Sequence, residues 1–321
     1  MANSAPPVRP VTIDDIRAAR ERIGGVITRT PLIRLRHDLD GVPEIWLKLE
    51  NLQPINAFKL RGGANAVAML ADDERSKGVW TISAGNAGQG VAYAAREAGV
   101  PCTVVVIETA PETKIERMRN LGATLVKAPF DACWNAMEER AFPGVEGTFV
   151  HPFDDHNFIA GNATVGLEIL EDLPSVKTVM CAIGGGGLIS GIASAIRGVA
   201  PHVKVIGVEP ETAAPGAKSF AAGSPQVFGD WQASFVDGAG GKSIFPRMWE
   251  RMKDIVDGSV IVTLDEVKVA MKLMASKVRV IAEGAGALGV AGALKQNDGP
   301  IVAVISGGNI DLKKFCEIVT A

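Results

Sequence analysis

Short apolar runs and amphipathic stretches alternate along the whole chain. Runs rich in β-branched residues predict buried strands, and stretches with apolar residues three or four positions apart predict helices. Thr12 and Asp15 have the spacing of a helix cap before the first of these helices. Strands are predicted at Ile45–Leu49, Val79–Ser83, Cys102–Ile107, Thr124–Lys127, Val176–Ile183, Val203–Val208 and Ile301–Ser306, and helices at Thr12–Arg20, Phe58–Leu70, Gly88–Ala98, Pro111–Leu121, Asn162–Glu171, Leu188–Val199 and Asp265–Ser276.

This alternation predicts an α/β fold with parallel sheets covered by helices. In open sheets of this kind, ligands bind beyond the carboxyl ends of the strands. The chain therefore predicts a two-lobed body whose cleft is lined by loops that follow strands. The loops in question are Ser83–Gly90, Gly184–Leu188, the region of Glu209, and Ser306–Asn309.

Composition narrows the function classes. The chain has 321 residues, enough for one large or two medium domains, and its net charge of −3 offers no basic surplus for nucleic acid. The 19 uncharged residues Thr178–Ile196 hold five glycines, which predicts a strand, a turn and a helix instead of a membrane span. No secretory signal is visible in the first ten residues, and the four cysteines lack CxxC spacing, so we expect a cytoplasmic protein without disulfides or zinc.

Gly184–Gly187 are four consecutive glycines between a predicted strand and a predicted helix. Their backbone N–H groups can turn inward toward an anion, with the positive end of the helix behind them. A tight turn with close backbone packing explains the same residues. The spacing matches neither the dinucleotide-binding pattern nor the nucleotide triphosphate loop.

Lys59 stands between Phe58 and Leu60 at the start of a predicted helix. A solvated lysine is the plain explanation. The alternative is a desolvated amine with a lowered pKa that can form an imine. Asp14, Asp15 and Lys48 have no comparable surroundings, and we predict that they are surface charges.

Two further loops carry polar side chains at strand ends. The segment Ser83–Gln89 is either an ordinary helix cap or a site where free N–H groups hold a carboxylate, with the Asn86 amide bonding a ring hydroxyl. Ser306–Asn309 is either a turn or the source of a hydroxyl donor.

Taken in order, these segments resemble the fold-type-II pyridoxal-phosphate enzymes, in the branch of serine/threonine dehydratases and serine racemases. The resemblance runs from about Ile13 to the C-terminus and includes the runs Leu47–Pro54 and Phe58–Gly62. It implies a two-lobed fold like that of tryptophan synthase β. The large cofactor-binding domain is expected at residues 1–52 and 153–321, and the small substrate-loop domain at residues 53–152. Because the chain ends soon after Ser306–Asn309, we expect no C-terminal regulatory domain. A catabolic role is expected for the same reason.

The resemblance also implies a role for each loop. Lys59 is expected to hold pyridoxal 5'-phosphate covalently and to act as the catalytic base, Phe58 to pack against the ring, and Asn86 to bond the 3'-oxygen of the cofactor. Ser306 is expected to face the pyridine nitrogen. The expected phosphate cup is Gly184, Gly185, Gly186, Gly187 and Leu188, and the expected substrate-carboxylate loop is Ser83, Ala84, Gly85, Asn86 and Ala87.

The implied activity is an ammonia-lyase that converts a threonine- or serine-type amino acid to a 2-oxo acid and ammonia, in a homodimer. Three alternatives stay open at this point. A β-replacement synthase similar to cysteine synthase is the nearest. A cofactor-free binding protein of the same fold is opposed by Lys59, and a dinucleotide-dependent oxidoreductase is opposed by the glycine spacing.

The chain departs from the family pattern at three places. Ala57 and Ala87 stand where the family usually has Ser and His, which predicts room for a β-substituent larger than methyl, such as that of 3-phenylserine. Ala84 stands where racemases of this branch have a serine, which predicts weak racemisation. The branch often binds a divalent or monovalent cation near Glu209, but Pro215 replaces an expected acidic ligand, so Glu209 is a weak metal candidate.

Overall fold

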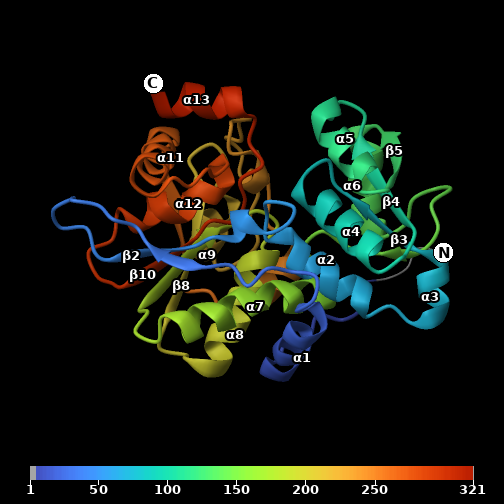
Figure 1. Ribbon diagram of the computed structural model, residues 1–321, viewed down its shortest axis with the longest axis horizontal. Coiled ribbons are helices and arrows are strands. Elements are labelled where there is room, and N and C mark those ends of the chain that lie inside the picture. The colour runs from blue at the N-terminus through green and yellow to red at the C-terminus, as the bar shows by residue number, and fades with distance from the viewer. Residues whose placement is uncertain (1–4, 321) are drawn as a thin grey trace.

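The computed structural model describes residues 5–320 and shows two lobes, each built on its own sheet (Figure 1). The larger sheet has the strand order β1-β2-β10-β7-β8-β9, and the smaller has β5-β4-β3-β6. All neighbours pair in parallel except β1 and β2. The strands are β1 (Leu32–Arg34), β2 (Ile45–Lys48), β3 (Val79–Ile82), β4 (Cys102–Ile107), β5 (Thr124–Ala128), β6 (Thr148–Phe149), β7 (Thr178–Ala182), β8 (Lys204–Pro210), β9 (Ser259–Val262) and β10 (Ile301–Val304).

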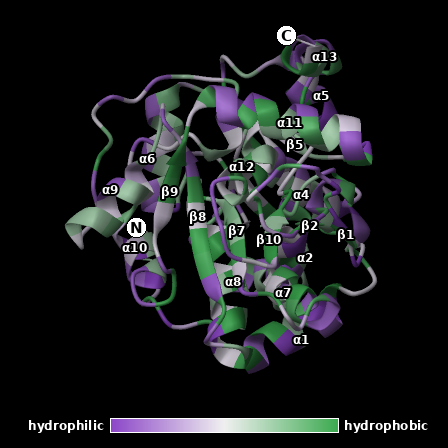
Figure 2. Ribbon diagram, turned by 90° about the vertical axis from the view of Figure 1, so that its left-hand side faces the viewer, coloured by the Kyte–Doolittle hydropathy of each residue, from purple (hydrophilic) through white to green (hydrophobic). Residues whose placement is uncertain are grey.

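Helices cover both faces of the larger sheet (Figure 2). Successive side chains of β7 point to opposite faces, so Val179 packs into one apolar cluster with α1, α7 and α8, and Met180 packs into another with α11, α12 and α13. Both faces of the strands are therefore buried, as parallel sheets require. The helices of this lobe are α1 (Ile13–Ile23), α7 (His156–Asp172), α8 (Gly187–Val199), α9 (Pro215–Ala222), α10 (Pro246–Met252), α11 (Leu264–Val278), α12 (Gly284–Ala293) and α13 (Leu312–Thr320), with short 3-10 turns η1 (Glu50–Leu52) and η2 (Asp237–Ala239).

The smaller lobe repeats this plan around its four strands. One face of β4 packs through Val104 against α2, α4 and α5, and the other packs through Val105 against α6. Helix α2 also packs against α7, so it links the two lobes. The helices are α2 (Lys59–Ala68), α3 (Asp72–Lys77), α4 (Asn86–Glu97), α5 (Glu112–Asn120) and α6 (Phe130–Glu139). The exact domain boundaries at residues 52/53 and 152/153 stay a prediction.

Every predicted strand and helix has a counterpart in the structure, with shifted ends. The capping box of Thr12 and Asp15 is confirmed. Helix α7 begins at His156, six residues earlier than predicted, because the side chain of Asp155 accepts a hydrogen bond from the Phe158 N–H at 2.8 Å. The strands and α-helices that were not predicted are β1, α3, α6, β6, α9, α10, β9, α12 and α13.

The prediction that Lys48 is a surface charge is wrong. Its side chain is 0% exposed, and its Nζ lies 2.6 Å from a carboxylate oxygen of Glu168 and donates to the Thr30 carbonyl at 2.7 Å. A lysine can be buried when a carboxylate neutralises it, and the partner comes from a helix 120 positions further along the chain. Asp14, in contrast, is exposed as predicted.

Thr178–Ile196 forms strand β7, the glycine loop and most of helix α8, as predicted. Across residues 5–320, no helix combines the length and apolar character that a membrane span requires. The first four residues of the segment searched for a secretory signal lie outside the described residues.

Candidate active site

Lys59 is the first residue of helix α2, the helix that links the two lobes. The Nζ donates a hydrogen bond to the Pro152 carbonyl at 2.6 Å and lies 5.2 Å and 5.4 Å from the ring centroids of Phe58 and Phe158. No salt bridge to it is found within residues 5–320. Burial therefore lowers the pKa of Lys59 to about 8. The amine is held in surroundings that favour its neutral, nucleophilic form.

The Pro152 carbonyl, which accepts the hydrogen bond from Lys59, lies in a turn that the neighbouring His151 stabilises. The Nδ1 atom of His151 accepts hydrogen bonds from the backbone N–H groups of Asp154, at 3.0 Å, and Phe153, at 3.3 Å. Burial, together with the nearby charge of Arg140, lowers the pKa of His151 to about 3. The imidazole is thus neutral at physiological pH and can act as the acceptor that this turn requires.

Two residues beyond Lys59, Arg61 anchors the same helix in a buried cluster of charges. Its Nε and Nη2 donate to Glu50 at 2.8 Å, and its Nη1 and Nη2 donate to Glu168 at 2.7 Å and 2.8 Å. Lys48 pairs with Glu168 as well, so the cluster contains two positive charges, Arg61 and Lys48, and two negative charges, Glu50 and Glu168. Burial opposes the ionised form of Glu50, but the charge and hydrogen bonds of Arg61 keep its pKa below the ordinary value. This pairing fixes the end of α2 that carries Lys59.

The glycine loop lies against the same turn. A Cβ atom on Gly185 would lie 2.3 Å from the ring of Phe153, and one on Gly184 would lie 2.9 Å from the Gly238 carbonyl, so neither position has room for a side chain. Gly186 has φ +85°, in the left-handed region. The loop leads into α8, whose N-terminal N–H groups are suited to a phosphate.

Eight of the nine predicted cofactor-binding residues, all except Asn86, line one cavity. Its lining is Phe58, Lys59, Ala182, Gly184, Gly185, Gly186, Gly187, Leu188, Gly238 and Ser306. The Phe58 N–H donates to the Ser306 carbonyl at 3.0 Å, which brings the end of β10 beside Lys59. An amine, an anion cradle without side chains and a hydroxyl at one cavity fit a phosphorylated aldehyde such as pyridoxal phosphate.

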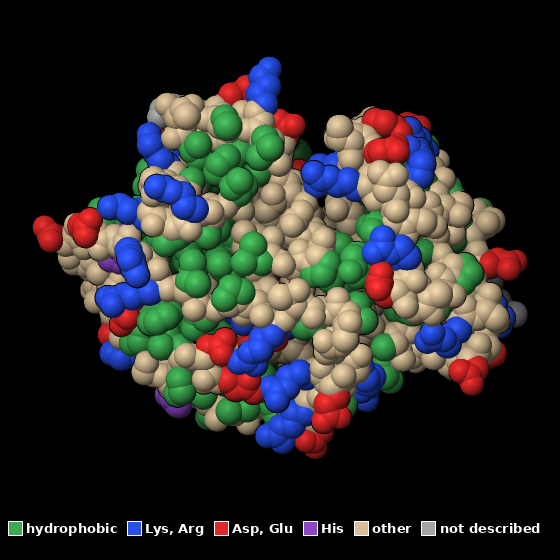
Figure 3. Space-filling view, in the orientation of Figure 1, with side chains coloured by type: hydrophobic (Ala, Val, Ile, Leu, Met, Phe, Trp, Pro, Cys, Tyr) green, Lys and Arg blue, Asp and Glu red, His purple; other side chains and the backbone are tan. Residues whose placement is uncertain are grey.

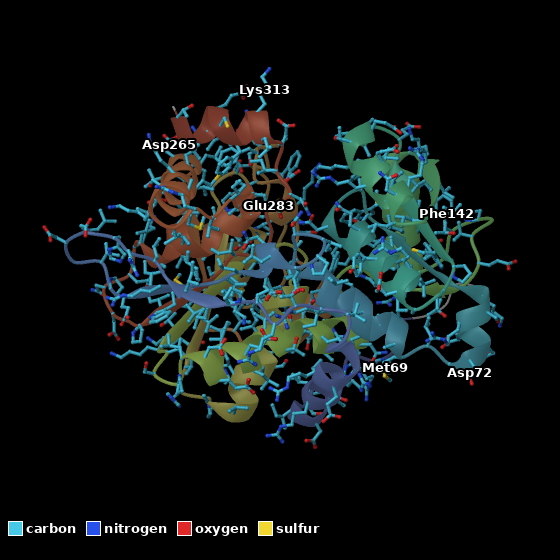
Figure 4. All side chains as sticks on the ribbon, viewed as in Figure 1. Met69, Asp72, Phe142, Asp265, Glu283 and Lys313 are labelled. Carbon is cyan, nitrogen blue, oxygen red and sulfur yellow. The ribbon has the colours of Figure 1, made fainter. Side chains whose placement is uncertain are left out.

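Asn86 belongs to a polar network across the lobes. Its Nδ2 donates to Glu283 Oε1 at 2.7 Å, and its Oδ1 accepts from Asn309 Nδ2 at 2.8 Å. Burial, with a contribution from the charge of Asp237, raises the pKa of Glu283 to about 7. Figure 4 places Glu283 on the part of the larger lobe that faces the smaller one. Sequence reasoning missed this residue; its only sequence signal is a lone carboxylate between apolar Ile281–Ala282 and the Gly/Ala-rich helix α12.

The predicted substrate loop lies at the start of α4 and is half-buried up to Asn86. The Ser83 hydroxyl accepts a hydrogen bond from the Gly85 N–H at 3.1 Å. Ala87 is buried. The loop does not line the cavity that holds Lys59, and Asn86 is tied to the larger lobe through Glu283 and Asn309. Its role in binding a substrate carboxylate stays a prediction.

Glu209 lies at the end of β8 with both carboxylate oxygens occupied. Oε1 accepts from the Gly216 N–H at 2.7 Å, and Oε2 accepts from the Ala217 N–H at 2.7 Å and the Ser259 hydroxyl at 2.6 Å. Within the part of the chain that the structure describes, no group of three or more His, Cys, Asp or Glu side chains is placed to hold a metal. A cation at Glu209 would have to displace these hydrogen bonds.

Comparison with known proteins gives the same family as the site. The model of the family described as pyridoxal-phosphate dependent enzyme matches residues 23–307. The L-threonine ammonia-lyase of Thermotoga maritima is 41% identical over 96% of this chain and 78% of its own. The catabolic L-threonine dehydratase of Staphylococcus aureus is 37% identical over 96% and 92%.

A solved structure, that of maize serine racemase, superposes with a TM-score of 0.89 at 31% identity and covers 96% of this chain and 97% of that one. The processed form of threonine deaminase isoform 2 from Solanum lycopersicum superposes with a TM-score of 0.83 at 30% identity, covering 98% and 99%. The predicted fold class and cofactor are confirmed. The chain belongs to the pyridoxal-phosphate dependent enzyme family, in its serine/threonine dehydratase branch, and is a carbon–nitrogen lyase.

Proposed function

We propose that this enzyme is a dehydratase of β-hydroxy-α-amino acids that converts threonine- or serine-type substrates to a 2-oxo acid and ammonia. The observation that carries the proposal is the amine of Lys59, buried without an acidic partner at the cavity lined by the glycine loop and Ser306. The ammonia-lyase and dehydratase relatives support the reaction type.

The residues of the chain have distinct tasks in this reaction. When bound, the cofactor delocalises the negative charge that develops on Cα. The free amine of Lys59 takes the Cα proton, the Cβ–O bond breaks, and protonated Lys59 supplies the proton with which the hydroxyl leaves as water. The released enamine tautomerises and hydrolyses to the 2-oxo acid and ammonia. The N-terminal turn of α4, from Gly85 onward, is suited to the substrate carboxylate.

Ser306 bears on the choice of reaction. A hydroxyl facing the pyridine nitrogen does not stabilise a protonated ring as a carboxylate would. The weaker electron sink suits elimination, in which the carbanion is short-lived, better than transamination.

Release of ammonia tests the proposal. Purified holoenzyme is incubated with L-threonine and L-serine, and ammonia and 2-oxo acid are measured together. Equal amounts of both products are expected. Formation of a thiol amino acid from sulfide and an activated serine, without ammonia release from threonine, would favour the β-replacement alternative instead. The relatives do not favour that alternative.

We also infer from Ala57 and Ala87 that the enzyme accepts a β-substituent larger than methyl, such as that of 3-phenylserine. Both side chains are buried, and each is smaller than the residue usual in the family. One added apolar group shifts selectivity by about 1–3 kcal/mol, so threonine still reacts. The test compares kcat/KM for L-threonine and L-threo-phenylserine, and a strong preference for threonine would reject the inference.

Racemisation is proposed to be weak, because Ala84 has no hydroxyl to protonate Cα from the face opposite Lys59. Serine recovered after partial turnover is analysed by chiral chromatography. Only the L-isomer is expected, and abundant D-serine would refute the proposal.

We further propose a cytoplasmic homodimer. Apolar side chains gather on the face of the larger lobe shown in Figure 3. Leu52, Ile281 and Leu312 are among the exposed large apolar residues of this lobe. A stable dimer would cover such residues. Sedimentation of the holoenzyme at micromolar concentration is expected to give twice the mass of the chain, and a monomer would contradict the proposal.

A further inference from the structure

A cavity of about 390 Å³ lies beside the glycine loop and takes walls from both lobes. Helix α6 supplies one wall through Phe130, Trp134 and Met137, and the segment 231–245 supplies the opposite wall through Trp231 and Phe245. The notch between the lobes is visible in Figure 3. Aromatic rings from separate parts of the chain thus enclose one space.

These rings contact one another in a row. Phe153 meets Phe245 edge-on with centroids 5.3 Å apart, Phe245 meets Trp134 in the same way at 5.3 Å, and Trp134 stacks on Phe130 at 6.1 Å. Trp231 donates its indole N–H to the Gly240 carbonyl at 2.7 Å. The mutual contacts hold the rings in place.

Two charged residues, Asp237 and Lys242, line the cavity. Asp237 pairs with Lys114 at 2.7 Å, an ion pair that joins η2 of the larger lobe to α5 of the smaller one. The amine of Lys242 lies 4.6 Å from the centroid of the Trp231 ring. Apart from Asp237, Lys242 and Ser243, the lining is aromatic, aliphatic or glycine, so most of the cavity suits an apolar group.

The aromatic cavity borders the cavity that holds Lys59. Gly184, Gly185 and Gly238 line both this cavity and the one that holds Lys59. Phe153, the innermost ring of the row, directly follows Pro152, whose carbonyl accepts the Lys59 amine at 2.6 Å. The aromatic row therefore begins one residue after the carbonyl that holds the amine of Lys59.

We propose that this cavity is the subsite for the β-substituent of the substrate, and that it takes an aromatic ring. The inference rests on the proposed dehydratase function and assigns the residues that receive the substituent. Neither Ala57 nor Ala87 lines the cavity. Trp134, Phe130 and Phe245 therefore set the specificity for a ring, and the two alanines contribute less to it.

Two substitutions on α6 test the subsite in opposite ways. Met137→Trp fills the cavity, and Trp134→Leu removes the central ring. In both variants the ratio of kcat/KM for L-threo-3-phenylserine to that for L-threonine is expected to fall about 10-fold or more, as for the loss of a fitted apolar contact. Phe142→Leu is the matched control, because Phe142 lies in the smaller lobe among the residues packed behind α6 and does not line the cavity. Its ratio is expected to stay unchanged.

A binding measurement supplements the rates. L-Phenylalanine has no β-hydroxyl to lose, so it is titrated into the holoenzyme while tryptophan fluorescence is followed, with L-alanine as the comparison. Binding of L-phenylalanine is expected to weaken about 10-fold in Met137→Trp, and binding of L-alanine is expected to change little.

The outcomes separate the two proposals. If threonine yields ammonia and neither variant changes the selectivity ratio or the binding of L-phenylalanine, the subsite is wrong and the dehydratase stands. If no β-hydroxy amino acid yields ammonia, the dehydratase fails. In that case the fluorescence titration alone decides whether the cavity binds a ring, with unchanged binding in the filled variant overturning it.

Discussion

Helix α2 carries two cations with opposite surroundings, the half-buried Lys59 and the fully buried Arg61. Lys59 donates only to a backbone carbonyl and has a pKa lowered to about 8 by burial. Arg61, two residues further on, is fully buried between Glu50 and Glu168 and stays charged. The protein thus keeps one charge neutralised for stability and leaves the other without a counter-charge for chemistry.

Activity is expected to change most when Lys59, the cation without a counter-charge, is removed. Lys59→Ala is expected to lower the rate of ammonia release by about 100- to 10,000-fold, because the catalytic base is lost. Its free energy of unfolding is expected to stay near that of the wild type, since no salt bridge is broken. Ammonia assays and urea unfolding measure the two quantities. Lys127→Ala, at an exposed position, is the control, and an active Lys59→Ala would break the comparison.

The second effect concerns stability, and it follows from removing Arg61, the neutralised cation. Arg61→Met leaves Glu50 and Glu168 as buried carboxylates with one positive charge fewer, so the free energy of unfolding is expected to fall by about 3–5 kcal/mol. Urea unfolding measures the loss.

Arg119→Met provides the matched control for that variant. Its side chain is 50% exposed and pairs with Glu112 and Glu116 at the surface, so a loss below about 1 kcal/mol is expected. Equal losses in the two variants would remove the distinction between the cluster and an ordinary surface pair.

Glu283, the carboxyl partner of Asn86 between the lobes, is a third group whose pKa is set by burial. Its pKa is raised to about 7 by burial, so the folded protein binds a proton that the unfolded chain releases near pH 4.5. The stability from this proton is present below pH 4.5 and is lost as the pH rises through 7, by about 3 kcal/mol at most. Unfolding of the wild type and Glu283→Gln between pH 5 and 8 should show a steeper decline in the wild type. Parallel curves would mean that Glu283 titrates normally.

The smallest effect is a shift of a midpoint. The rate at which the apoprotein captures pyridoxal phosphate is expected to rise with pH to a plateau, with a midpoint near pH 8, because the neutral amine of Lys59 reacts. Rapid-mixing absorbance at a series of pH values measures it. A midpoint near 10.5, the ordinary value for lysine, would show that the amine is solvated.

Local patterns were sufficient for much of the molecule. The strand ends followed by Gly184–Gly187 and Ser306, and the helix that begins at Lys59, are confirmed in position. Each depends on residues close together in the sequence. The meeting of these loops in one cavity follows from the shared edge of parallel strands.

Features that depend on distant partners were not predictable in this way. Lys48 resembles any surface charge until Glu168, on another helix, is placed beside it. The pKa of Glu283 depends on burial between the lobes, and the aromatic row joins Trp134 and Phe245 across more than a hundred positions. Periodicity carries no information about such contacts.

The most direct test of the account locates the cofactor on the chain. Holoenzyme is reduced with borohydride and digested with trypsin, and the labelled peptide is sequenced by mass spectrometry. One labelled peptide is expected, with the label on Lys59. A label on any other lysine, or a holoenzyme that loses all its cofactor after reduction and denaturation, would contradict it.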